Sequence, residues 1–144
     1  MDYLKLESQA CFPVYALSRV FTAHYKPLLD NIGLTYPQYL VMMVIWQERQ
    51  MSVKEIGEKL LLDSGTLTPL LKKLETKKLV SRIRSDRDER VVNISLTKSG
   101  EALKAKAVMI PELFKCSLDL SLSEITSLRD TVNLILEKTK QNNK

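Results

Sequence analysis

The sequence has few of the residues on which several classes of protein depend. It contains two cysteines and one histidine in 144 residues. Two cysteines are too few for a disulfide scaffold, so we expect reduced thiols and a cytoplasmic protein. One histidine and two distant cysteines cannot supply a tetrahedral metal site, and the four glycines form neither a Walker nor a dinucleotide-binding fingerprint. We therefore expect no metal and no cofactor.

Long apolar runs are also missing. No stretch reaches the roughly 20 apolar residues of a membrane-spanning helix, and residues 1–8 lack the basic and apolar regions of a secretory signal. The chain is long enough for one domain with its own hydrophobic core. With 44% hydrophobic and 27% charged residues, its composition is that of a helix-rich globular protein.

The net charge of +5 is concentrated in one quarter of the chain. Residues 72–106 carry eleven Lys and Arg against five Asp and Glu, and the rest of the chain is nearly neutral. A contiguous basic block is expected of a surface that binds a polyanion such as DNA. A solvated basic face would have the same composition, so charge alone does not decide between the two.

Residues 52–76 have the pattern of a helix-turn-helix. Ser52 and Glu55 form a capping box that opens a short helix, and a break follows at residues 62–63. Ser64 is expected to cap a second helix with a stripe of leucines along one face. The opposite face carries small hydroxyl and lysine side chains, which suit a helix that enters the major groove of DNA.

The period of the sequence changes after this helix. Residues 80–84 and 91–96 are rich in strand-forming residues, and the segment between them is entirely polar. A charged β-hairpin directly after a recognition helix predicts a winged helix, mainly α with a small β-hairpin. Because the basic block coincides with this helix and this hairpin, we predict that they bind double-stranded DNA. The candidate DNA-binding residues are Ser64, Thr66, Thr68, Pro69, Lys72, Lys73, Arg84, Arg87, Asp88 and Arg90.

Further helices are expected on both sides of this core. Residues 8–31 show the spacing of a long amphipathic helix, with Pro13 in its first turn and Cys11 at its N-terminal end. Thr35 is expected to cap a buried helix. Thr97 should cap a helix over 98–118, and a capping box of Ser121 and Glu124 should open the C-terminal helix.

These outer helices predict a homodimer. A single domain of this size cannot bury all of their apolar stripes, and a symmetric operator requires a two-fold protein dimer. We expect one domain over residues 1–144, with a DNA-binding core at about 35–100. Residues 1–34 and 101–144 would then supply the dimerisation helices.

Over essentially its whole length the chain resembles the MarR family of transcriptional regulators. Residues 88–97 are similar to the wing signature of that family, an Asp-x-Arg followed by a strand that ends in Leu-Thr. Residues 62–75 are similar to the recognition helix of the organic-hydroperoxide-sensing (OhrR-type) repressors. The resemblance implies a dimeric repressor that binds an inverted-repeat operator, has an organic hydroperoxide as its inducer, and is not an enzyme.

The same resemblance implies the sensor. Repressors of this type sense peroxide through a cysteine near the start of the first helix, which Cys11 matches, and Tyr25 and Tyr36 match the tyrosines that hydrogen-bond to its sulfur. Independently, the N-terminal end of a helix favours the thiolate, which a peroxide oxidises to a reversible sulfenic acid. Cys116 resembles the resolving cysteine of the two-cysteine subgroup, which forms an intersubunit disulfide.

The residues by themselves leave alternatives open. A free cysteine is most often a small buried hydrophobic residue, so Cys11 and Cys116 could be inert, and both tyrosines could simply pack at the edge of the core. Within the same fold, the protein could be a regulator that a small phenolic ligand releases from DNA, or a redox-responsive global regulator. A thiol peroxidase is a function of a different class and is disfavoured, because an enzyme does not require a basic wing.

Overall fold

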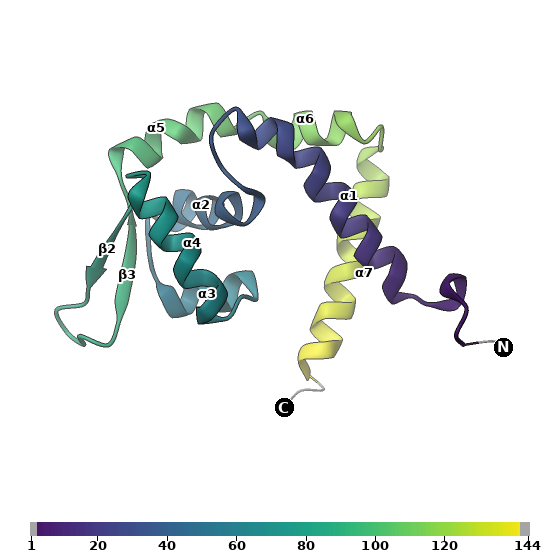
Figure 1. Cartoon of the computed structure of the whole chain (residues 1–144), viewed down its shortest axis with the longest axis horizontal. Helices are drawn as coiled ribbons and strands as arrows, with labels where there is room; N and C mark the ends of the chain where they lie inside the picture. The colour runs from purple at the N-terminus through teal and green to yellow at the C-terminus, as the bar shows by residue number, and fades with distance from the viewer. Residues whose placement is uncertain (1–2, 142–144) are drawn as a thin grey trace. The chain divides into compact units, whose positions relative to one another are not determined.

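The computed structural model describes residues 3–141 (Figure 1). In chain order the elements are η1 (Leu6–Ser8), α1 (Cys11–Asp30), α2 (Tyr36–Glu48), β1 (Gln50–Ser52), α3 (Val53–Leu60), α4 (Ser64–Thr76), β2 (Val80–Arg84), β3 (Val92–Leu96), α5 (Lys98–Ala107), α6 (Ile110–Ser117) and α7 (Leu122–Gln141). The chain folds into two compact units, Met1–Ile110 and Pro111–Lys144. Across residues 3–141, no helix is long and apolar enough to cross a membrane.

The first unit is built around α2. Its apolar side chains point in all directions, and Val41, Met42 and Ile45 are completely buried. They can be buried because α2 contacts α1, α3, α4, α5 and the sheet. The helix begins at Thr35, whose hydroxyl accepts from the Gln38 N–H while the Gln38 amide accepts from the Thr35 N–H. The expected cap and the expected burial of this helix are both confirmed.

The hairpin belongs to a three-stranded antiparallel sheet with strand order β1-β3-β2. Strands β2 and β3 pair from Val80 opposite Leu96 to Arg84 opposite Val92, which confirms the predicted wing. Strand β1, in which Met51 lies opposite Ile94, was not predicted. Its three residues are too few to show a period, and they form a strand only because β3 offers an open edge.

The start of α4 differs in detail from the prediction. The break lies where expected, with Leu61 in the left-handed region at φ 55°. The cap, however, is Asp63 rather than Ser64, because the Asp63 carboxylate accepts from the Thr66 N–H at 2.9 Å. Ser64 is therefore the first residue of the helix. Both residue types are good caps, so the sequence alone could not separate two neighbours.

The helix expected over residues 98–118 is interrupted. Thr97 caps α5 as predicted, by accepting from the Gly100 N–H. However, α5 ends at Ala107 and α6 begins at Ile110. Proline has no N–H, so Pro111 cannot donate to the carbonyl of Ala107, four residues earlier, and its ring crowds that carbonyl. Cys116 therefore lies on a separate short helix of the second unit.

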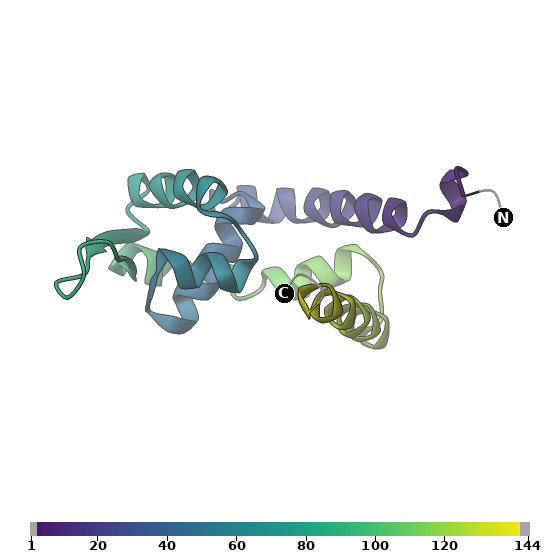
Figure 2. The same ribbon diagram turned by 90° about the horizontal axis from the view of Figure 1, so that it is seen from below.

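Apolar side chains remain exposed on the outer helices of both units. Figure 2 shows α1 as one long helix whose N-terminal half extends away from the rest of the first unit, and Val14 there is 62% exposed. In the second unit, Ser121 and Glu124 form the predicted capping box of α7. On that helix, Leu134 and Ile135 are 52% and 54% exposed. Such surfaces mark a place of contact with another molecule.

Candidate DNA interface and redox site

The recognition helix α4 buries one face and exposes the other. Leu67, Leu71 and Leu74 point into the core and are at most 1% exposed. The predicted DNA-binding residues of this helix lie outside that stripe, with Thr68 half-buried and Ser64, Thr66, Pro69, Lys72 and Lys73 exposed. The Thr66 hydroxyl also donates to the Asp63 carboxylate, so this side chain belongs partly to the cap.

A cavity of about 540 Å³ brings part of the predicted set together. It lies between α3, α4 and the hairpin, and Ser64, Thr68 and Arg90 all line it. Two further basic residues, Lys54 and Arg82, line the same cavity and were not among the predicted site residues. Strand alternation from the buried Val80 is the signal that could have placed Arg82 on the face toward α4.

The tip of the hairpin is held by its own polar side chains. Asp88 accepts from the backbone N–H of Arg90 at 3.0 Å, and the Ser85 hydroxyl accepts from the N–H of Arg87 at 3.2 Å. Asp88 therefore shapes the backbone on which Arg90 is presented. Arg84 instead lines a second cavity, of about 310 Å³, together with Glu75 and Arg82.

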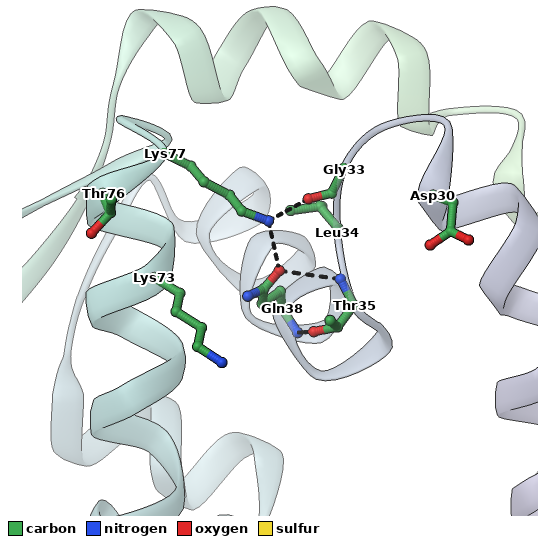
Figure 3. A pocket seen from close by; sticks show the side chains of 8 residues that line it. All are labelled: Asp30, Gly33, Leu34, Thr35, Gln38, Lys73, Thr76 and Lys77. Carbon is green, nitrogen blue, oxygen red and sulfur yellow. Dashed lines mark hydrogen bonds between the residues drawn. The ribbon is translucent and has the colours of Figure 1, made fainter.

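Lys73 lies apart from the other candidates. It lines a cavity of about 380 Å³ on a different flank of α4, with Gln38 and Lys77 (Figure 3). Lys73 thus lies on the flank of α4 that faces the start of α2, away from the cavity that Ser64, Thr68 and Arg90 line.

Cys11 is the first residue of α1 and is exposed. Ala10 precedes it at the N-cap and has no side chain that can accept a hydrogen bond from the first turn. The N–H groups of this turn can therefore stabilise a negative charge on the sulfur.

Tyr25 and Tyr36 lie against each other between α1 and α2. Their ring centroids are 4.7 Å apart, and the ring of Tyr39 lies 6.0 Å from that of Tyr25. Burial, helped by the nearby Tyr36 and Tyr39, raises the pKa of Tyr25 to about 12, and burial raises the pKa of Tyr36 as well. Both phenols therefore stay protonated at neutral pH and can act as hydrogen-bond donors.

Cys11 is not brought to these tyrosines within one chain. It is separated from Tyr25 by fourteen positions of the same helix, which at 1.5 Å per residue amounts to about 21 Å along the axis. A hydrogen bond between this sulfur and the phenols of its own chain is therefore excluded while α1 is intact.

Cys116 is exposed on α6. Its thiol donates weakly to a carboxylate oxygen of Glu112 at 3.9 Å, and the same carboxylate pairs with Lys115 at 2.7 Å. The hydrogen bond that Lys115 donates to the Glu112 carboxylate raises the pKa of Lys115. Across residues 3–141, neither cysteine belongs to a group of three or more His, Cys, Asp or Glu side chains that could hold a metal ion.

A helix-turn-helix followed by a basic β-hairpin is the architecture of a winged-helix DNA-binding protein. Residues 23–107 match the family model described as transcriptional regulator SarA/Rot. The chain is 47% identical over 142 residues to the organic hydroperoxide resistance transcriptional regulator of Bacillus subtilis, which covers 99% of this chain and 97% of that protein. The chain belongs to the MarR and SarA/Rot family of transcriptional regulators, in agreement with the sequence prediction.

Solved structures agree with this assignment. Reduced AbfR bound to DNA has a TM-score of 0.84 and 31% identity, and the match covers 100% of this chain and 99% of that one. The disulfide form of AbfR has a TM-score of 0.62 and 33% identity over 94% and 90% of the two chains. AbfR is a protein of Staphylococcus epidermidis. Reduced AbfR was solved bound to DNA, and the Bacillus subtilis relative is a transcriptional regulator.

The raised pKa of Tyr25 predicts a loss of stability at alkaline pH. The unfolded chain ionises this phenol near pH 10, whereas the folded chain retains the proton up to about pH 12. Between these values the unfolded state binds fewer protons, so the free energy of unfolding falls as the pH rises. Urea unfolding followed by the fluorescence of Trp46 should show a smaller fall for Tyr25→Phe than for the wild type. Equal falls would show that Tyr25 ionises at its ordinary pKa.

Proposed function

We propose that this protein is a dimeric repressor that releases its operator when an organic hydroperoxide oxidises Cys11. The observation that carries the proposal is the 47% identity, along nearly the whole chain, to an organic hydroperoxide resistance regulator. The exposed Cys11 at a helix N-terminus and the protonated tyrosine pair supply the chemistry that this function needs. Free thiols and DNA as a partner both suit the cytoplasm.

The DNA complex follows from the geometry of the winged helix. The exposed face of α4 enters the major groove, where Ser64 and Thr68 contact base edges and Lys72 contacts a phosphate. Arg90, from the same cavity, reaches the adjacent minor groove, whose negative potential attracts arginine in A·T-rich sequences. Two copies related by a two-fold axis then read an inverted repeat with half-sites about one helical turn apart.

A second copy of the chain covers the exposed apolar helices. Val14 in α1 and Ile135 in α7 are both more than half exposed, which is unusual for side chains of this kind on a stable surface. We assign dimerisation to residues 1–34 and 101–144 and DNA binding to residues 35–100, in one domain.

The redox site forms between the two copies. Because Cys11 is about 21 Å from Tyr25 along its own helix, the tyrosine pair of one copy serves the sulfur of the other. The thiolate attacks the distal oxygen of the hydroperoxide, the O–O bond breaks, and the alcohol leaves with a proton from solvent. The neutral sulfenic acid accepts weaker hydrogen bonds from Tyr25 and Tyr36 than the thiolate did. The two α4 recognition helices of the dimer are then no longer held at the spacing that fits the two half-sites.

Cys116 is the proposed resolving residue. Its exposed thiol attacks the sulfenic sulfur of Cys11 from the other copy, a disulfide forms, and water leaves. The two Cα atoms must come within about 7 Å for this bond. Such a shift would deform the dimer interface further.

One observation favours a phenolic ligand as the second candidate inducer. A cavity of about 450 Å³ between α1 and α2 is lined by Tyr36, Leu29 and the cationic Arg19. Its size and mixed lining suit a small aromatic anion. In that case the ligand would release DNA without any change at Cys11.

Replacing Arg90 tests the wing. Arg90→Ala should cost roughly 1–3 kcal/mol of operator affinity and lower the salt slope by about one, because one cationic contact is lost. Arg129→Ala is the matched control. It removes the same charge from an exposed arginine on α7, which is not part of the wing. Affinities can be measured by fluorescence anisotropy at several salt concentrations. Unchanged binding by Arg90→Ala at all of them would remove the wing from the interface.

Replacing each cysteine tests the sensor. Cys11→Ser should bind operator DNA as the wild type does but should not release it when cumene hydroperoxide is added. Cys116→Ser should still be oxidised but should give no covalent dimer on a non-reducing gel. Release of DNA by Cys11→Ser under hydroperoxide would favour the ligand hypothesis, and a covalent dimer of Cys116→Ser would rule out the resolving role.

A mixed dimer tests whether the site is shared. One copy carries Cys11→Ser and the other carries Tyr25→Phe and Tyr36→Phe, both in a Cys116→Ser background. If tyrosines serve the partner's sulfur, this dimer keeps one complete site, and its single Cys11 thiol should react at the wild-type rate. If they serve their own chain, no complete site remains and the thiol should react slowly. Thiol loss after a hydroperoxide pulse distinguishes the two arrangements.

A further inference from the structure

We propose that Lys77 and Gln38 form a bridge that passes the redox state of the sensor to the recognition helix. This inference rests on the proposed function and adds two positioning residues to it. Neither residue touches Cys11 or is assigned to a DNA base, and their role is to join the elements that do.

The Lys77 ammonium connects three parts of the first unit. Lys77 is the C-cap of α4, and its Nζ donates to the Gln38 amide oxygen at 3.1 Å and to the backbone carbonyl of Gly33 (Figure 3). These acceptors are 39 and 44 residues away in sequence. One side chain thus ties the end of the recognition helix to the first turn of α2 and to the turn that follows α1.

Gln38 is a rigid acceptor. It is a buried polar residue, only 2% exposed. The same amide oxygen that binds Lys77 accepts from the Thr35 N–H at 3.1 Å, and the Gln38 backbone N–H donates to the Thr35 hydroxyl. A buried amide cannot rotate freely without breaking such bonds. Any displacement of the first turn of α2 is therefore transmitted to Lys77.

The sensor tyrosines lie at the same junction. Tyr36 is the first residue of α2, between Thr35 and Gln38, and its ring packs at a tilt against that of Tyr25 on α1. Gly33, with φ at 68°, makes the turn that joins these two helices. When oxidation of the sulfur weakens its bonds to the phenols, the helix turn that moves is the one that holds Gln38.

The surroundings allow this contact to break and re-form. The bridge borders the cavity of about 380 Å³ that Asp30, Lys73 and Thr76 also line. Figure 3 shows Lys73 pointing toward this space with no bond drawn to the bridge. The Lys77 ammonium therefore has room to leave its acceptors. Lys73 carries a like charge one helical turn away, and its repulsion disfavours positions in which the Lys77 ammonium stays close by without its hydrogen bonds. A contact at a cavity can change state more easily than one inside a close-packed core.

The measured quantity is the ratio of the operator dissociation constants of oxidised and reduced protein. Allosteric couplings typically amount to about 5- to 150-fold, and we expect Lys77→Met to reduce the wild-type ratio at least about fivefold. Loss of the Cys11 thiol to cumene hydroperoxide should proceed at the wild-type rate, because Lys77 does not touch the sensor. Lys138→Met removes the same charge from the exposed end of α7 and should keep the wild-type ratio.

Variants of Gln38 separate the bridge from the charge. Gln38→Leu removes the acceptor and should reduce the ratio as Lys77→Met does. The double variant should reduce it no further, because both single changes break the same Lys77–Gln38 hydrogen bond. Gln38→Glu retains the acceptor and the capping box, so it should retain the ratio.

Three outcomes would overturn the bridge. A lower melting temperature with an unchanged ratio would make Lys77 and Gln38 merely structural. An equal loss of affinity in both redox states, with the salt slope lowered by about one, would make Lys77 a phosphate ligand. A ratio of one in the wild-type protein would overturn the proposed function and the bridge with it. If the wild type shows a ratio well above one and Lys77→Met shows the same ratio, the bridge alone is overturned.

Discussion

The burial of the apolar body of α2 is the constraint on which the rest of the first unit depends. A helix that is apolar all round is stable only if other elements surround it, and α1, α3, α4, α5 and the sheet all contact it. Its first turn holds Tyr36 and Gln38, and at its other end the Trp46 indole donates to the Gly100 carbonyl of α5 at 2.8 Å. The tyrosine pair of the proposed sensor, the recognition helix and the helix after the wing are therefore positioned by one buried element.

The two functional regions use opposite features of the same fold. The proposed DNA interface is cationic, with Arg82 and Arg90 from the hairpin and Ser64 from α4 lining one cavity. The tyrosine pair is half-buried and neutral, and burial keeps its protons in place. A charge change at the sensor can alter DNA binding only through the elements between these regions. The short path from Tyr36 through Gln38 to Lys77 provides such a connection.

Local signals predicted the elements of the fold well. The caps at Thr35, Ser52 and Thr97 were correct, because a capping side chain acts on the next three residues and needs no distant partner. The failures have equally definite causes. Asp63 and Ser64 are equivalent as caps by sequence, Pro111 ended a helix whose apolar spacing continues past it, and β1 depends on pairing with a strand more than forty residues later.

The sequence by itself determined the winged helix and the basic face of α4, since these follow from period and composition. Cys11, Tyr25 and Tyr36 became candidates through the resemblance of the sequence to the organic-hydroperoxide-sensing repressors. Only the tertiary structure decided which residues meet. It placed the ring centroids of Tyr25 and Tyr36 4.7 Å apart, put Arg82 and Arg90 on the lining of one cavity, and joined Lys77 to Gln38 across 39 residues. It also separated Cys11 from the tyrosines of its own chain by about 21 Å of helix. Contacts between distant residues arise from packing around α2, and no local pattern encodes them.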